Sequence, residues 1–245
     1  MITSPRSLAR FAIASLALLL VHLPVAHGQV TSISSIRITE AMSSSGVGGT
    51  PDWWEITNYG VSAVDISGWK MDDSSFNFAN SVALVGVTSI APGETAVFLE
   101  SAAPVTDIPN FRSFWTGTSA TTPQIGSYSG SGVGLSSTGD GVVLFDSLGS
   151  EVTPRVTFGV ATTGSSFYYS YDSSGSPATS PNSSALLSAV GTISGQVTFA
   201  SASSSPANVG SPGTAINAVP EPSALALLAG AAVGGVAVIR RRRLA

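Results

Sequence analysis

The chain has 245 residues, enough for one packed domain with tails, and it carries a formal net charge of −4. It contains no cysteine, which excludes disulfides and thiolate metal sites as a source of stability. Over residues 29–219 there is no histidine, and four basic against thirteen acidic side chains give a net charge near −9. Such an acidic surface disfavours nucleic acid as a partner.

The N-terminus has the features of a secretory signal peptide over residues 1–28. Two arginines precede an apolar run over residues 11–25, and residues 26–28 place small side chains at the −3 and −1 positions of a cleavage site. We expect the general secretion machinery to export the chain and signal peptidase to cut before Gln29. The alternative is an uncleaved membrane anchor.

The middle of the chain alternates short apolar stretches with turn residues. Because no convincing amphipathic helix interrupts this pattern, it predicts an all-β domain, a sandwich or barrel, over residues 29–200. The expected strands are residues 36–39, 53–57, 64–66, 82–87, 95–99, 142–145, 151–152, 156–158, 166–171 and 196–200.

Three stretches lack strand patterning. Residues 101–131 suggest a long inserted loop, and residues 172–188 suggest a second loop. Residues 201–218 are rich in Ser, Gly and Pro, and we expect a flexible spacer that holds the domain away from a membrane.

The C-terminus predicts a transmembrane helix. Residues 223–239 carry no charge and are followed directly by four arginines. A helix of this length reaches about 25 Å, the short end of what a bilayer requires, and the arginines stay on the cytoplasmic side. The alternative is a buried core helix.

Serine hydrolysis lacks its usual base, since no histidine remains after residue 28. A Ser–Lys dyad would need Lys70, the only lysine, which we interpret instead as a solvated partner of Asp72 and Asp73.

Paired carboxylates beside sugar-stacking aromatics would be the material for a carbohydrate site. The candidates are Glu40, Glu55 and Asp140 with Trp53 and Trp69. The alternative, which we favour, places these carboxylates on strand faces and the tryptophans in the core.

Asp72, Asp73 and Asp140 are weak candidates for calcium, because the twelve-residue calcium loop pattern is absent. Turn capping by Asp is the alternative. We expect no metal and no cofactor, and we assign no catalytic residue.

The tail over residues 219–245 resembles the PEP-CTERM sorting signal. That signal consists of a short Pro-Glu-Pro motif, an apolar helix and a cluster of arginines at the C-terminus. The residues that carry this likeness are Val219, Pro220, Glu221, Pro222, Arg240, Arg241, Arg242 and Arg243. The resemblance implies transient anchoring in the inner membrane, cleavage by an exosortase-type processing protease, and release to the cell surface or an exopolysaccharide matrix.

The domain resembles the lamin tail family through five motifs in that family's order. These lie at residues 36–40, 52–58, 65–69, 90–94 and 134–144, within a core match over residues 33–160. The resemblance implies an immunoglobulin-like β-sandwich with no active site to transfer. Residues 204–213, which end in Gly210, Ser211, Pro212 and Gly213, are similar to the usual tail of bacterial members, so the domain has an alternative boundary there.

Together these features predict an exported, non-enzymatic surface or extracellular-matrix protein. Its immunoglobulin-like domain would make structural or adhesive contacts, with exopolysaccharide among its neighbours. The competing hypothesis is a carbohydrate-binding or carbohydrate-active surface protein that uses Trp and carboxylate side chains.

Overall fold

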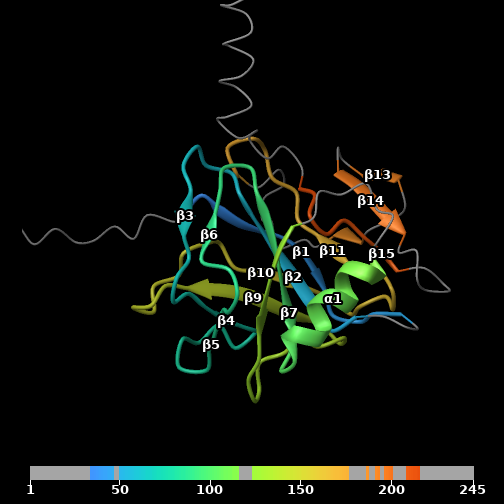
Figure 1. The fold of residues 1–245 in the computed structure, drawn as a ribbon, viewed down its shortest axis with the longest axis horizontal. Coiled ribbons are helices and arrows are strands. Elements are labelled where there is room, and N and C mark those ends of the chain that lie inside the picture. Colours follow the sequence, from blue (N-terminus) through green and yellow to red (C-terminus); the bar gives the residue numbers. More distant parts are fainter. Residues whose placement is uncertain are drawn as a thin grey trace, which may run out of the picture. The chain divides into compact units, whose positions relative to one another are not determined.

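The computed structural model describes residues 34–46, 50–115, 123–176, 186–187, 191–193, 196–200 and 208–215. The regular secondary structure of these residues consists mainly of strands in sheets that enclose an apolar core, which confirms the all-β class (Figure 1). The expected signal helix and transmembrane helix lie outside the described residues and stay predictions. Within the described part of the chain, no helix has the length and apolar character needed to cross a membrane.

The larger sheet has six strands in the order β12–β11–β1–β2–β7–β8. Neighbouring strands are antiparallel, except that β8 runs parallel to β7. The strands are β1 (Ile36–Met42), β2 (Trp53–Asn58), β7 (Thr95–Glu100), β8 (Gln124–Tyr128), β11 (Phe167–Tyr168) and β12 (Leu186–Leu187).

The second sheet has four antiparallel strands in the order β10–β9–β4–β5. They are β10 (Val156–Phe158), β9 (Asp140–Phe145), β4 (Lys70–Asp72) and β5 (Val82–Ala83). The main core lies between the two sheets, where Trp54 stacks on Phe98 with ring centroids 4.8 Å apart. Burial of this apolar surface is the main stabilising contribution to a fold without disulfides.

Two smaller groups of strands complete the described structure. They are β3 (Val64–Asp65) with β6 (Ser89–Ile90), and β13 (Gly191–Ile193), β14 (Gln196–Ala200) and β15 (Val209–Gly210) in that order. The strand expected at residues 151–152 is a single bridge from Phe145 to Glu151, and β12 lies inside the expected loop at residues 172–188.

The outer face of the larger sheet is covered by a helix that the sequence reading did not predict. Helix α1 (Pro104–Phe114) and strand β8 both lie in the stretch expected as a loop, residues 101–131, so that expectation is wrong. The prolines at positions 104 and 109 lower the helix propensity of this segment, so its sequence does not indicate a helix. Pro104 is nevertheless tolerated, because it lies in the first turn. Trp53 packs edge-on against Phe111 of this helix, with ring centroids 5.7 Å apart.

Strand β1 contains a bulge that decides which side chains reach this outer face. Ile38 pairs with Ile56 and Glu40 pairs with Glu55, so Thr39 is an extra residue in the ladder. Since Trp54 and Ile56 belong to the main core, strand alternation directs Glu55 to the opposite side of the sheet, the side of α1. The bulge brings both Thr39 and Glu40 to that side as well.

Residues 208–215 are part of the packed domain, which differs from the spacer expected over residues 201–218. Asn208 and Ser211 have no exposed surface, and β15 pairs with β14. The alternative boundary suggested by the likeness of residues 204–213 to the tail of bacterial members agrees with this packing at residues 208–213. Residues 201–207 and 216–218 lie outside the described residues.

Candidate functional site

Two buried carboxyl groups face each other on the outer side of the larger sheet. Glu40 of β1 and Glu55 of β2 are partners in the antiparallel register, and neither has any exposed surface. Directly opposed residues in such a pair have Cβ atoms about 5 Å apart. Burying two acids this close is costly unless they are hydrogen-bonded or neutralised.

Glu40 accepts three hydrogen bonds. The backbone N–H of Ser211 donates to Oε1 at 2.8 Å, and the Ser211 hydroxyl donates to Oε2 at 2.6 Å. The Ser166 hydroxyl also donates to Oε1. Two of the three donors therefore belong to a residue that lies 171 positions further along the chain.

Glu55 accepts two hydrogen bonds. The hydroxyl of Thr39, the bulged residue of β1, donates to Oε1 at 2.7 Å. The backbone N–H of Gly213 donates to Oε2 at 2.5 Å. The φ angle of Gly213 is 87°, in the left-handed region that glycine adopts at little cost.

The environment of this pair favours a retained proton. Burial raises the pKa of Glu40 to about 7, against the opposing effect of the hydrogen bonds from Ser166 and Ser211. Burial and the charge of Glu40 raise the pKa of Glu55 well above its usual range. Two facing carboxyls seldom ionise together, so the pair as a whole favours a state that keeps a proton.

We call residues 208–213 the C-terminal clasp, because they close over this pair. The clasp is anchored at its start, where Asn208 Oδ1 accepts from the N–H of Gly46 at 2.9 Å and the N–H of Val209 donates to the carbonyl of Gly164 at 2.7 Å. A Cβ atom added at Gly210 would lie 3.0 Å from Oε1 of Glu40 and 3.2 Å from the Trp115 ring. A glycine at position 210 therefore permits this close approach.

A second group of acids lies at one edge of the inter-sheet core. The N–H of Glu100, at the end of β7, donates to the carbonyl of Asp52 at 2.8 Å. Burial and the neighbouring Glu100 raise the pKa of Asp52 to about 7, and burial also raises the pKa of Glu100. Tyr128, 1% exposed, has the pKa of its phenol raised by burial and then by Glu100, Asp52 and Asp140. The sequence reading gave Asp52 and Glu100 no special role.

The three calcium candidates make turn contacts, although the buried Oδ1 of Asp72 has no hydrogen-bond partner among the described residues. Asp72 accepts from the Ser75 hydroxyl and the Asn77 N–H, and Asp73 accepts from the Ser75 N–H. Asp140 accepts from three backbone N–H groups, those of residues 74, 136 and 141. Throughout the described residues, no three His, Cys, Asp or Glu side chains are grouped so as to hold a metal ion.

Only two of the residues expected to form a carbohydrate site lie next to each other in the structure. Glu40 and Glu55 come together, but Asp140 begins β9 in the other sheet. Trp53 is fully buried and Trp69 is 7% exposed, so neither presents a ring face on which a sugar could stack.

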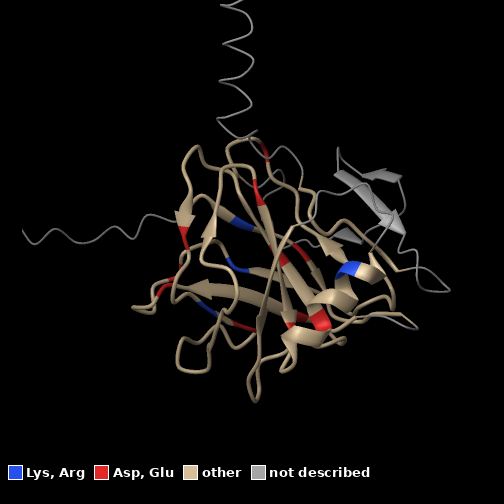
Figure 2. Ribbon diagram, viewed as in Figure 1, with Lys and Arg blue, Asp and Glu red and all other residues tan. Residues whose placement is uncertain are grey.

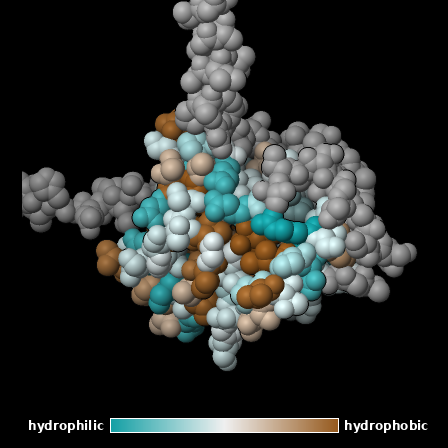
Figure 3. Space-filling model, in the orientation of Figure 1, coloured by the Kyte–Doolittle hydropathy of each residue, from teal (hydrophilic) through white to brown (hydrophobic). Residues whose placement is uncertain are grey.

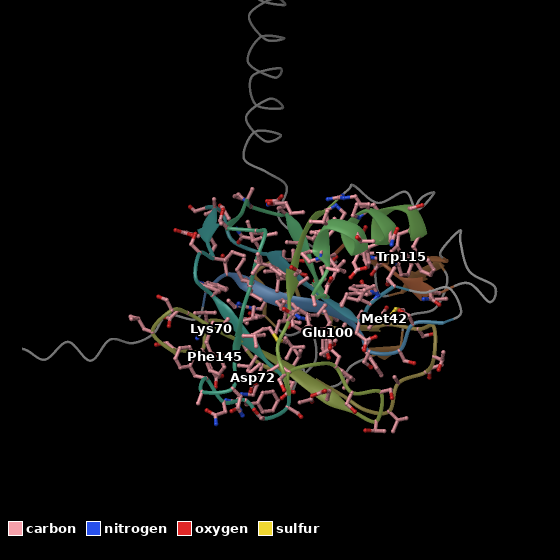
Figure 4. All side chains as sticks on the ribbon, turned by 60° about the horizontal axis from the view of Figure 1, so that its bottom comes forward. Met42, Lys70, Asp72, Glu100, Trp115 and Phe145 are labelled. Carbon is pink, nitrogen blue, oxygen red and sulfur yellow. The ribbon has the colours of Figure 1, made fainter. Side chains whose placement is uncertain are left out.

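Figure 4 shows where other side chains singled out above lie. Met42 and Trp115 lie near α1, where both belong to the smaller apolar cluster. Lys70 lies near Phe145 in β4 and β9, and its ammonium group is 4.8 Å from the centroid of the Phe78 ring rather than in an ion pair with Asp72 or Asp73. Lysine over an aromatic face is a modest cation–π contact.

The surface of the domain is predominantly acidic among its charged positions. Figure 2 shows more Asp and Glu than Lys and Arg along the described ribbon. The face in Figure 3 mixes hydrophobic residues with hydrophilic ones. The large exposed apolar side chains are dispersed along the sequence, at Val61, Val85, Val105, Leu148 and Val160.

The comparisons with known proteins agree with this architecture. The Lamin Tail Domain family model matches residues 29–159, more than half of the chain. A search of curated proteins found no match. The immunoglobulin-like lamin tail domain, with two packed β-sheets, fits a non-enzymatic structural or interaction protein. The chain belongs to the lamin tail domain family.

Proposed function

We propose that this protein is exported, sorted through its C-terminal tail by an exosortase-type protease, and displayed at the cell surface or in the extracellular matrix. Its lamin tail domain then makes structural or adhesive contacts. The tail that supports this proposal is the motif at residues 219–222, the uncharged residues 223–239 and the terminal arginines. These residues lie outside the described part of the chain.

The sealing of the Glu40–Glu55 pair is the observation that best supports a non-enzymatic role. A glycosidic bond is cleaved only if both carboxyls reach it, and neither of these has exposed surface. All four oxygens of the pair accept hydrogen bonds from the protein itself. The pair therefore supports the fold rather than a reaction.

The burial of all four tryptophans argues in the same direction. The most exposed of them, Trp69, has 7% of its surface accessible. Carbohydrate-binding surfaces rely on aromatic faces that a sugar can cover, so a flat stacking platform built from tryptophan is absent from this domain. We therefore place the carbohydrate-active alternative second.

The sorting step is tested by substitution in the native host. Glu221→Ala should block processing, because the residues of the motif are those a sorting protease reads. The expected result is a longer, membrane-retained chain, whereas the wild type appears shorter in the surface or matrix fraction. The matched control is Glu151→Ala, which removes an exposed acid of the domain and should leave sorting unchanged. Equal processing of the two variants would refute the proposal.

Contact with the extracellular matrix is tested separately. We expect the protein to co-purify with extracellular polymer from the native host, in the presence or absence of calcium. Complete recovery of the processed protein in the polymer-free medium would contradict a matrix role without affecting the sorting claim.

A further inference from the structure

The cover over the Glu40–Glu55 pair comes from a segment far outside the family match. The C-terminal clasp begins almost 50 residues after the matched region ends at residue 159. It nevertheless supplies hydrogen bonds to the first two strands of the fold. We propose that the clasp is proton-controlled: it stays closed while the Glu40–Glu55 pair shares a proton, and it opens when both carboxyls are ionised. This proposal is independent of how the tail is sorted.

The hydrogen bonds show why clasp and pair depend on each other. Five donors reach the four carboxyl oxygens, and three of the five come from Ser211 and Gly213. If the clasp leaves, one oxygen of each carboxyl loses its only described donor. Water must then enter to solvate them, because buried polar groups without partners are costly.

The charged groups around the pair show why the presence of a proton decides whether the clasp is closed or open. Tyr168 of β11 is the strand partner of Glu40. The apolar Val97 of β7 is the strand partner of Glu55. The clasp and β14 contain no titratable residue, and α1 carries Arg112 at an exposed position in its last turn. The charge of Glu55 also acts on the phenol of Tyr59. No described basic side chain is among the groups that set the ionisation of the two glutamates.

Two ionised carboxylates would therefore repel each other in a site to which the described residues bring no counter-charge. With one proton, the pair carries a single negative charge and still presents oxygens to the clasp donors. Without it, two charges share a buried space, and exposure to solvent becomes the favoured state. The raised pKa of each glutamate is consistent with this arrangement.

Opening is expected to be local, because the two ends of the clasp are held differently. The start is fixed by backbone bonds and by Asn208, none of which involves an ionisable group. The end, from Ser211 to Gly213, is held to the sheet by bonds to Glu40 and Glu55. The hinge between the two parts is Gly210.

A single engineered cysteine can report this movement, since the chain has none of its own. Pro212 is buried, so a thiol in Pro212→Cys reacts with maleimide only when the clasp opens. The reference is Val160→Cys, at a site that is 74% exposed, in the same full-length chain. The ratio of the two labelling rates cancels the pH dependence of the thiol itself.

The proposal expects this ratio to rise about tenfold between pH 5.5 and pH 8.5, the change that one pKa unit of coupling produces. In a Glu55→Gln background the ratio should stay nearly constant, because the amide keeps a hydrogen to donate and does not ionise. A ratio that is the same at both pH values in the wild-type background would overturn the proposal. So would an equal rise in the Glu55→Gln background, with folding checked by tryptophan fluorescence. If Glu55→Gln does not fold, Glu40→Gln replaces it as the background. The change of the labelling ratio with pH in the wild-type background still tests the proposal without either variant.

Discussion

The backbone N–H of Gly213 donates to Oε2 of Glu55 at 2.5 Å, although the two residues are 158 positions apart in the chain. Two positions earlier, the backbone N–H of Ser211 donates to Oε1 of Glu40 at 2.8 Å. The last described residues of the chain are thereby joined to the first two strands. A domain that the family match would end at residue 159 is completed only near residue 213.

Removal of one clasp donor should destabilise the domain. Ser211→Ala deletes the hydroxyl that donates to Oε2 of Glu40, a fully buried oxygen, and we expect a loss of about 2 kcal/mol in the free energy of unfolding. Urea denaturation of the full chain measures this loss. Ser174→Ala removes an exposed hydroxyl that caps a turn and should change the stability by less than about 0.5 kcal/mol. Equal losses in both variants would contradict the importance of the clasp.

The stability of the domain should fall as the pH rises from acidic to neutral. The pKa of Glu40 is about 7 in the folded protein, above the usual value of 4.5, so the folded state holds this proton more tightly than the unfolded state. This contribution is fully present below about pH 4.5 and is lost as the pH rises through about 7, at up to about 1.4 kcal/mol per pH unit. Glu55 and Asp52 shift stability in the same direction.

Denaturation midpoints measured at pH 5, 6, 7 and 8 test this trend. Glu55→Gln should flatten the curve, since it removes one of the two coupled acids. A domain more stable at pH 8 than at pH 5 would show that the buried acids do not behave as described.

The helix α1 should contribute through a few buried aromatic contacts rather than along its whole length. Phe111→Ala removes a ring that packs edge-on against Trp53 and should cost about 3–5 kcal/mol in unfolding free energy. Val105→Ala, on the same helix but 90% exposed, should change the stability by less than about 0.5 kcal/mol. Thermal unfolding of the two variants side by side compares them. A tolerated Phe111→Ala would mean that α1 does not seal this face of the sheet.

Asp52 and Glu100 should titrate as neighbours. Glu100→Gln removes a charge that raises the pKa of Asp52, so this pKa should move down from about 7 towards its ordinary value. NMR titration of the Asp52 carboxyl carbon measures the change. Glu94→Gln is the matched control, because Glu94 instead binds the N–H of Ala91 and should leave Asp52 unaffected. An unchanged Asp52 titration in Glu100→Gln would leave burial as the sole cause of the shift.

Much of the sandwich could be predicted from local sequence patterns. The alternation of residues 53–57 predicts β2, and it correctly places Trp54 and Ile56 on one face and Glu55 on the other. Alternation alone suggests that the polar face meets solvent. The face is buried here because α1 and the clasp cover it, and no pattern within β2 contains that information.

Helix α1 illustrates a different limit. Ile108, Phe111, Phe114 and Trp115 have the spacing of an apolar helical stripe, and that signal was available in the sequence. The proline at position 109 counts against a helix, because proline in a helix interior removes a hydrogen bond. Packing against Trp53 and Val97 compensates for this cost in the folded protein.

The clasp could be predicted only through the likeness of residues 204–213 to the tail of bacterial members. Their composition is that of a flexible linker, and the two glutamates to which Ser211 and Gly213 donate lie more than 150 positions earlier. The pairing of Glu40 with Glu55 also depends on the bulge at Thr39, and no local sequence pattern predicts that bulge.

The most direct test of the proposed function is the intact mass of the protein recovered from its native host. We predict a surface or matrix species that lacks residues 1–28 and the arginine-ended tail beyond the motif at residues 219–222, but retains the clasp. A full-length polypeptide in the cytosolic fraction, with both hydrophobic ends present, would contradict the account.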